Sequence, residues 1–166
     1  MKSRNGFLLA ELMVVLALFM FVTGLTFSLT KVFGRMIMRQ EIDFFIQFIR
    51  AEQMQAIAKQ KDRTILFDVQ NRAYVCDGQK IELSPHIAFC APKDALGPPS
   101  SPKNQIQNYV TFQNAVLILF ATGAISSGIV YLGSSDYNSY YAISIGITAL
   151  GFVRVYRYEN GKWNKI

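Results

Sequence analysis

The chain has 166 residues, of which 51% are hydrophobic and only 17% are charged, and its formal net charge is +6. This length allows one domain with a real core, and it is too short for two cores together with a membrane segment. Because so apolar a composition is unusual for a soluble domain, part of the hydrophobicity should lie outside the core. The mild positive charge excludes no class of partner, since a solvated surface explains it as well as nucleic acid or an anionic membrane does.

The N-terminal part of the chain supplies that apolar segment. Leu12 to Thr30 is a run of nineteen residues without a charge, and as a helix it would be roughly 28 Å long, close to the thickness of a bilayer's hydrocarbon core. It continues into more helix-forming sequence instead of ending in small residues, so cleavage after it is not expected. The segment is therefore predicted to span a membrane once. Basic residues flank it on both sides, so charge alone leaves its orientation open.

One carboxylate, Glu11, lies at the start of this apolar run. An ionised acid inside a membrane helix costs on the order of 2 to 3 kcal/mol and usually signals a partner. Two explanations stay open from the residues alone. Either Glu11 reaches the head-group layer at the start of its helix, or it meets a cation that another molecule supplies.

The stretch GFLLAELMVVL, from Gly6 to Leu16, resembles the class III signal sequence of type IV pilins and type II secretion pseudopilins. It combines a short basic leader, a Gly-Phe junction, a Glu four residues beyond the Phe and an uninterrupted apolar helix. The resemblance implies that the prepilin peptidase, a membrane aspartyl protease, removes residues 1–6 by cutting between Gly6 and Phe7. It also implies that the new amino terminus of Phe7 is methylated. Leu8 departs from the pattern, in which Thr or Ser is common, and we expect no effect on processing.

The same resemblance implies a partner for Glu11, namely the α-amino group of Phe7 on a neighbouring subunit, or its own before assembly. Opposite charges displaced along a helix attract strongly in a low dielectric, so they favour one axial stagger between subunits. Glu11 is thus expected to set the register of assembly. The implied partners are other pilin or pseudopilin subunits, the prepilin peptidase, an inner-membrane assembly platform and an exported substrate, and no cofactor is implied. The implied location is the bacterial inner membrane, crossed once, with the head in the periplasm or outside the cell.

Beyond the apolar run, a hydrophobic stripe recurs at helical spacing. A helix from Phe7 to about Lys59 would be roughly 80 Å long, far longer than a small domain needs. We expect residues 7–30 to form its transmembrane and assembly half and residues 31–60 to pack on the head. Gly24 and Gly34 are unfavourable inside a helix by about 1 kcal/mol each. Either a bend or local melting of the helix, or close packing between helices in the membrane, would explain them. The stripe consists of Met38, Ile42, Phe45, Ile49 and Ala56, widened by Phe44 and Phe48 and interrupted by Gln53.

After Lys61, short β-branched and aromatic runs favour strands separated by turns. The expected fold class is α+β, with the long helix packed on an antiparallel β-sheet head at residues 61–166. Turns are predicted at 70–72 and at Asp77-Gly78, where a type I′ turn needs two positive φ angles. All five prolines fall within residues 84–107, which we predict to be a long surface loop. Strands are predicted at Thr64–Val69, Ala73–Cys76, Gln79–Leu83, Tyr109–Phe112, Val116–Phe120, Gly128–Leu132, Tyr140–Ile147 and Phe152–Tyr158.

The second half of the head is similar to the C-terminal region of the GspH/FimT family of minor pseudopilins and minor pilins. The similarity lies in Phe120-Ala121-Thr122-Gly123, in Gly128 with its strand and in the final hairpin of residues 142–158. With the leader, it implies a pilin fold. From Asn104 to Val153 the only charged side chain is Asp136, so this stretch should be mostly core or surface that meets other subunits.

Catalytic and metal sites find little support in the residue pattern. His86 is the only histidine, and no oxyanion or orienting motif accompanies it, so we expect no enzyme activity. A zinc site of His86, Asp77 and the two cysteines matches no standard spacing, and no metal site is expected. For Cys76 and Cys90, a disulfide formed in an oxidising compartment and two reduced core thiols stay open.

Basic and aromatic residues alternate near the C-terminus, where they could hold phosphates and stack bases. Some FimT-like minor pilins are associated with DNA uptake through a basic C-terminal region. A solvated edge hairpin, whose cations discourage sheet-to-sheet aggregation, is the favoured interpretation. The basic residues are Arg154, Arg157, Lys162 and Lys165, and the aromatic residues are Tyr156, Tyr158 and Trp163.

The expected function is structural, as a minor pseudopilin or pilin subunit of an inner-membrane filament for type II-like protein secretion. The first alternative is a minor type IV pilin in DNA uptake, adhesion or motility. The second is a single-span anchor for an unrelated β domain, which would leave residues 1–6 uncleaved.

Overall fold

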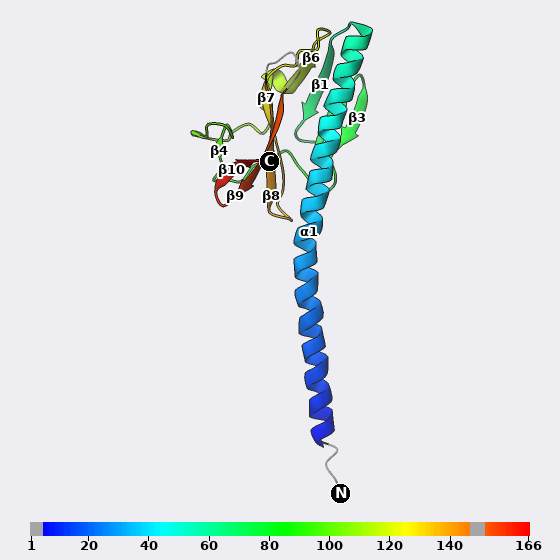
Figure 1. The fold of residues 1–166 in the computed structure, drawn as a ribbon, viewed down its shortest axis with the longest axis vertical. Coiled ribbons are helices and arrows are strands. Elements are labelled where there is room, and N and C mark those ends of the chain that lie inside the picture. The colour runs from blue at the N-terminus through cyan, green and yellow to red at the C-terminus, as the bar shows by residue number, and fades with distance from the viewer. Residues whose placement is uncertain (1–4, 147–151) are drawn as a thin grey trace.

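The computed structural model describes residues 5–146 and 152–166, and for residues 5–9 and 25–31 it describes the backbone alone. A single long helix, α1 (Asn5–Lys59), precedes a head made of short strands. The C-terminal half of α1 packs along the head, and its N-terminal half projects beyond it (Figure 1). The predicted α+β class is confirmed, and the predicted helix end at about Lys59 is confirmed as well.

Two antiparallel four-stranded sheets make up most of the head. The first sheet has the strand order β3-β2-β1-β6, the second has the order β10-β9-β8-β7, and β4 and β5 form a separate pair. The strands are β1 (Arg63–Asp68), β2 (Ala73–Cys76), β3 (Gln79–Glu82), β4 (Leu96–Gly97), β5 (Asn104–Gln105), β6 (Val116–Leu119), β7 (Gly128–Ser134), β8 (Ser139–Ile145), β9 (Val153–Glu159) and β10 (Lys162–Lys165), with a short 3₁₀ turn, η1 (Gln113–Ala115), before β6.

The core lies between α1 and the inner faces of both sheets. The predicted stripe of α1, from Met38 to Ala56, is buried there, which confirms that part of the helix as the packing half. Phe48 packs against this core, but Phe44 is 52% exposed, so its assignment to the stripe was wrong. The reason is geometric, because one residue turns a helix by about 100° and places Phe44 well to the side of Phe45. The sheets contribute Ile65, Phe67, Tyr74, Leu117, Val130, Leu132, Tyr141 and Ile143.

Strand positions follow the predictions closely, and local turn chemistry explains why. Asp77 and Gly78 have φ angles of 48° and 82°, which confirms the predicted hairpin turn between β2 and β3. Asn160 and Gly161 have φ angles of 52° and 77° and join β9 to β10 in the same way. Strand β10 was not among the predicted strands, although the Asn-Gly pair before it is a strong hairpin signal.

Residues 109–112 do not form a strand, contrary to the prediction. Only Val110 makes a bridge, to Val130 of β7, with flanking backbone bonds from Thr111 to Ile129 and from Tyr131 to Tyr109. The chain then leaves β7, because Phe112 is followed by η1, where two residues adopt positive φ angles. This contact therefore stays too short to count as a strand.

The proline-rich segment 84–107 differs from the predicted surface loop. It contains the β4–β5 pair, and Ile87, Phe89 and Ala95 within it are almost fully buried. Ile87 and Phe89 are part of the main core, where the ring of Phe89 lies against that of Phe67. Ala91 and Ile106 pack instead on the outer face of the second sheet, which is also apolar, with Tyr131, Ala142 and Tyr156 in a small separate core. The segment covers part of that face, and the Trp163 indole donates to the Leu96 carbonyl at 2.9 Å.

The charge-poor stretch from Asn104 to Val153 is only partly core where the structure describes it, because many of its residues are half-buried or exposed. Val110, Phe112 and the inner residues of β6, β7 and β8 are buried. The alternative of a surface that meets other subunits therefore stays open for its exposed residues, which include residues 107–109. Residues 147–151, which include parts of the predicted strand Tyr140–Ile147 and Gly151 of the final hairpin, lie outside the described residues.

Candidate assembly surface

The projecting half of α1 is apolar on every side. Its large hydrophobic side chains are between 46% and 74% exposed, and none packs on the head. A helix that is hydrophobic all round is normally buried in lipid or among other chains. This surface therefore needs a covering that the chain itself does not provide. Its members are Leu12, Met13, Val14, Val15, Leu16, Leu18, Phe19, Met20, Phe21 and Val22.

No helix in the part of the chain that the structure describes combines the length and hydrophobicity needed to cross a membrane. The predicted span, Leu12 to Thr30, includes residues 25–30, whose side chains lie outside the described residues.

Two polar side chains of this half, those of Thr23 and Glu11, differ in whether they have a hydrogen-bond partner within the described chain. The Thr23 hydroxyl donates to the carbonyls of Phe19 and Met20 at 2.8 and 3.0 Å, so it is satisfied within the helix. Glu11 is exposed and has no hydrogen-bond or ion-pair partner among the described residues. Glu11 is thus open to a cation from outside the chain. Gly6 and Phe7 lie where only the backbone of α1 is described, so their predicted processing roles fall outside the described side chains.

The exposed apolar surface of the projecting half continues along the head as an uncharged stripe on α1. Phe33, Met36, Phe44 and Met54 are 59%, 62%, 52% and 68% exposed. At about 100° per residue they lie almost opposite the buried stripe from Met38 to Ala56. We call this set the outer stripe. Its intervening positions are Gln40, Gln47 and Ala51, so no charge separates the apolar side chains.

Gly34 marks the place where the head meets the exposed half of the helix. The ring of Tyr137, from the turn between β7 and β8, lies against Gly34 and occupies the space that a Cβ atom would need. Gly24 has no atom within 4 Å of its own Cβ position. Gly34 is therefore closely packed, but against the head of the same chain and not against another helix in the membrane. The helix is continuous through both glycines.

A buried ion pair joins the C-terminal part of α1 to the first sheet. Arg63 of β1 contacts Glu52 at 2.5 Å, and both side chains are 10% exposed. Arg63 also pairs with Asp77 at 2.8 Å. Gln53, which interrupts the stripe in the sequence, donates to the Gly123 carbonyl at 2.5 Å. These polar contacts give the helix one defined orientation on the head, and periodicity alone did not reveal them.

The two cysteines are both free, and they lie in separate surroundings. The Cys76 thiol donates to Glu52 at 3.2 Å, and burial, together with the hydrogen bond and charge of Glu52, raises the pKa of Cys76 to about 11. Cys90 lies near Gly133 of β7, and burial raises the pKa of its thiol. The structure thus has two reduced thiols in place of a disulfide. Both are protonated at neutral pH, which makes them poor nucleophiles.

His86 has a local partner, since its Nδ1 lies 2.9 Å from the Asp136 carboxylate. Its ring is also 5.7 Å from that of Tyr137, centroid to centroid. Within residues 5–146 and 152–166, no group of three or more His, Cys, Asp and Glu side chains is placed to hold a metal ion. Both of these contacts of His86 are with residues of the β7–β8 turn.

The four basic residues considered for nucleic acid are divided between two faces of the second sheet. Arg154 is the cross-strand neighbour of Ser144, and Lys165 is the cross-strand neighbour of Tyr156. Both basic residues therefore lie on the face of the sheet that is directed away from α1. Arg157 and Lys162 lie on the other face, because side chains alternate along a strand, and Arg157 pairs with Glu159 at 2.6 Å. The structure does not bring the four together into one basic surface.

No family model, curated protein or solved structure matches the chain. The resemblance noted in the sequence is supported at the level of architecture, by a long N-terminal helix packed on antiparallel sheets as in a pilin-like fold.

Proposed function

We propose that this protein is a structural subunit of a pilin-like filament at the bacterial inner membrane, most specifically a minor pseudopilin of a type II-like secretion system. The observation that supports this is the projecting half of α1, whose described side chains from Leu12 to Val22 are exposed and apolar on all sides, together with Glu11, which has no partner among the described residues. A rod of this kind suits two environments in turn, lipid before assembly and the helices of neighbouring subunits afterwards.

The proposal includes a processing step. Removal of residues 1–6 would free the amino group of Phe7, four positions before Glu11. Lys2 and Arg4 would leave with the leader, so the formal charge of the processed chain falls from +6 to +4. The new amine would be the cation for Glu11 on the next subunit, and it would couple processing to assembly. Because the pair would lie in a low dielectric, a subunit at the wrong axial position would leave two charges unpaired.

The outer stripe supports the same function. It extends the exposed apolar surface from the projecting half to the level of the head, where a neighbouring helix could pack against it. The buried pair of Arg63 and Glu52 would hold the head in one orientation around this rod. A filament subunit needs both properties, since a repeating contact requires the same geometry in every copy.

Intact-mass measurement on the chain purified from its native host tests the proposal. The expected mass corresponds to a chain that begins at Phe7 and carries one methyl group. A mature chain that still begins at Met1 would refute the pilin-like function and favour a plain membrane anchor. Replacement of Gly6 by a bulky residue should block cleavage and serves as the control.

A further inference from the structure

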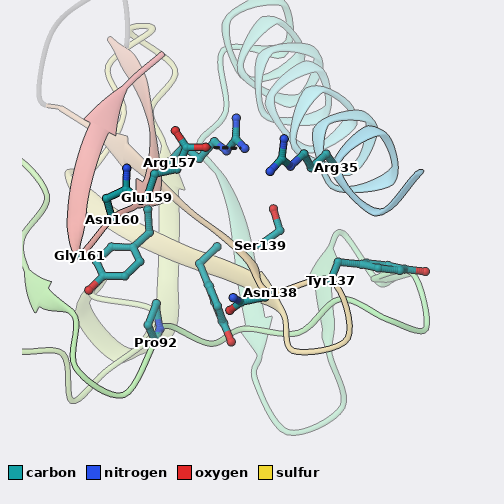
Figure 2. A pocket seen from close by; sticks show the side chains of 11 residues that line it. Arg35, Pro92, Tyr137, Asn138, Ser139, Arg157, Glu159, Asn160 and Gly161 are labelled. Atoms are coloured by element: carbon teal, nitrogen blue, oxygen red, sulfur yellow. Dashed lines mark ion pairs between the residues drawn. The ribbon is translucent and has the colours of Figure 1, made fainter. Parts of the chain in front are cut away.

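A cavity of about 530 Å³ lies where α1 passes the end of the second sheet nearest its projecting half. This size falls within the roughly 300–1,000 Å³ of typical ligand pockets. Its walls come from four parts of the chain, namely α1, the β7–β8 turn with the start of β8, the end of β9 with the β9–β10 turn, and Pro92 (Figure 2). Both turns lie at the same end of the sheet, close to the point where the helix leaves the head (Figure 1).

The charges in this cavity are unbalanced. Arg35 of α1 and Arg157 of β9 point toward one another across it (Figure 2). Arg157 pairs with Glu159 at 2.6 Å, whereas Arg35 has no ion-pair partner among the described residues. The cavity thus holds two guanidinium groups and only one carboxylate among its lining residues. An anion between them would relieve their repulsion, and guanidinium groups bind phosphate through paired N–H donors.

The other walls suit a phosphate with a polar attachment. Tyr140 and Tyr158 are half-buried in the cavity wall, and Asn138 and Asn160 stand at its turns. Their hydroxyl and amide groups are hydrogen-bond donors. Burial raises the pKa of Tyr140, so its hydroxyl keeps its proton at neutral pH. Tyrosine is also enriched at membrane interfaces, because its ring is apolar and its hydroxyl is polar.

The position of the cavity along α1, relative to the uncharged run, indicates the source of such a phosphate. Arg35 lies five residues beyond Thr30, the last residue of the uncharged run, which is about 7 Å along a helix. The head-group region extends roughly 5–7 Å beyond the hydrocarbon core on each side. With the uncharged run in the hydrocarbon, Arg35 would stand at the level of the lipid phosphates.

We propose that the cavity binds the phosphate of an anionic phospholipid head group between Arg35 and Arg157. The proposal rests on the membrane insertion contained in the proposed function. A zwitterionic lipid binds less well, because its own cation meets the net positive charge of the cavity. A bound head group would hold the β7–β8 and β9–β10 turns at the membrane surface and would release them when the subunit leaves the lipid for a filament.

Native mass spectrometry tests this binding. The full chain is purified from its native host and released from detergent micelles that contain equal amounts of phosphatidylglycerol and phosphatidylcholine. The expected result is one phosphatidylglycerol retained in preference. Arg35→Gln should reduce its retention roughly tenfold or more, because a charged hydrogen bond is lost. Arg39→Gln, one turn further along α1, is the matched control and should lose no more than the roughly fivefold of a general surface charge.

Glu159→Gln is a second variant, and it should change the retention of phosphatidylglycerol in the opposite direction to Arg35→Gln. It removes the carboxylate that competes for Arg157, so retention of phosphatidylglycerol should increase, a result that a purely structural role for these residues would not produce. Equal losses in Arg35→Gln and Arg39→Gln would overturn the proposal. So would retention of free glycerol phosphate at the same concentration as the lipid, because the site would then serve a soluble phosphate. The same spectra report the N-terminus, so an unprocessed chain and lost lipid selectivity are distinguished.

Discussion

Glu11 is the only charged residue in the stretch from Ala10 to Gly24, and it stands exposed with no partner in the described part of the chain. The side chains that follow it on the helix, from Leu12 to Val22, are all apolar, so they offer nothing to offset its charge. An isolated carboxylate in such a position is costly in lipid. A role in contacts between subunits would explain why it is there.

Replacement of Glu11 by Leu should leave cleavage after Gly6 intact and should strongly reduce incorporation into filaments, because the register-setting charge is lost. Immunoblots of sheared filaments against membrane fractions would measure both. Glu11→Asp, which keeps the charge, is the control and should retain much of the incorporation. Normal incorporation of the Leu variant would contradict the register argument.

Gly24 and Gly34 lie on the same helix but should respond oppositely to substitution by Ala. At Gly34 a Cβ atom would meet the Tyr137 ring, and such overpacking typically costs about 1–3 kcal/mol. At Gly24 nothing lies within 4 Å, so Ala should favour the helix by about 1 kcal/mol. Thermal unfolding in detergent should show a lower melting temperature for Gly34→Ala alone. Its recovery in a Gly34→Ala, Tyr137→Ala double variant would confirm the contact.

The attachment of α1 to the first sheet depends on a few polar contacts within an otherwise apolar interface. Arg63 reaches Glu52 from β1, and Cys76 of β2 donates to the same carboxylate. Removing one partner of a buried ion pair leaves an uncompensated charge, which costs more than the pair contributes.

Arg63→Met should therefore destabilise the chain by about 3–5 kcal/mol. Urea unfolding followed by the single tryptophan, Trp163, would measure the change. Lys80→Met, which breaks the exposed pair with Glu82, is the matched control and should have little effect on stability, because solvent screens the pair. Similar losses for the two variants would show that the Arg63 pair is not the anchor of the helix.

Along the head, α1 has two surfaces with different surroundings. One is buried by the head, and the other, the outer stripe, faces away from it without a charge. A soluble domain gains nothing from exposing Phe33, Met36, Phe44 and Met54 in a row, whereas a helix that packs among its copies does.

Phe44→Glu should leave the stability of the chain unchanged within about 0.5 kcal/mol, because the side chain is half exposed. It should reduce filament incorporation, since it places a charge in the contact between helices. Leu66→Glu, at a similarly exposed position on the outer face of the first sheet, is the control and should assemble normally. Equal behaviour of both variants in the filament assay would argue against the outer stripe as a contact surface.

Local patterns were sufficient for most elements of this protein. The apolar run, the stripe from Met38 to Ala56 and the Asp77-Gly78 turn each depend on neighbours within a few residues, so periodicity and turn chemistry predicted α1, its packing face and the first hairpin. The candidate Glu11 was likewise visible in the sequence, because a single charge in an apolar run stands out without any fold.

Other features arise only when distant parts of the chain meet, and no local pattern encodes them. Tyr137 against Gly34, Arg63 beside Glu52 and the cavity between Arg35 and Arg157 join residues that the folding of the sheets brings together. The separation of Arg154 from Arg157 onto opposite faces and the burial of Phe89 in a proline-rich segment follow from the same cause. Side-chain alternation and sheet packing assign each residue to a face, and those assignments depend on which strands pair.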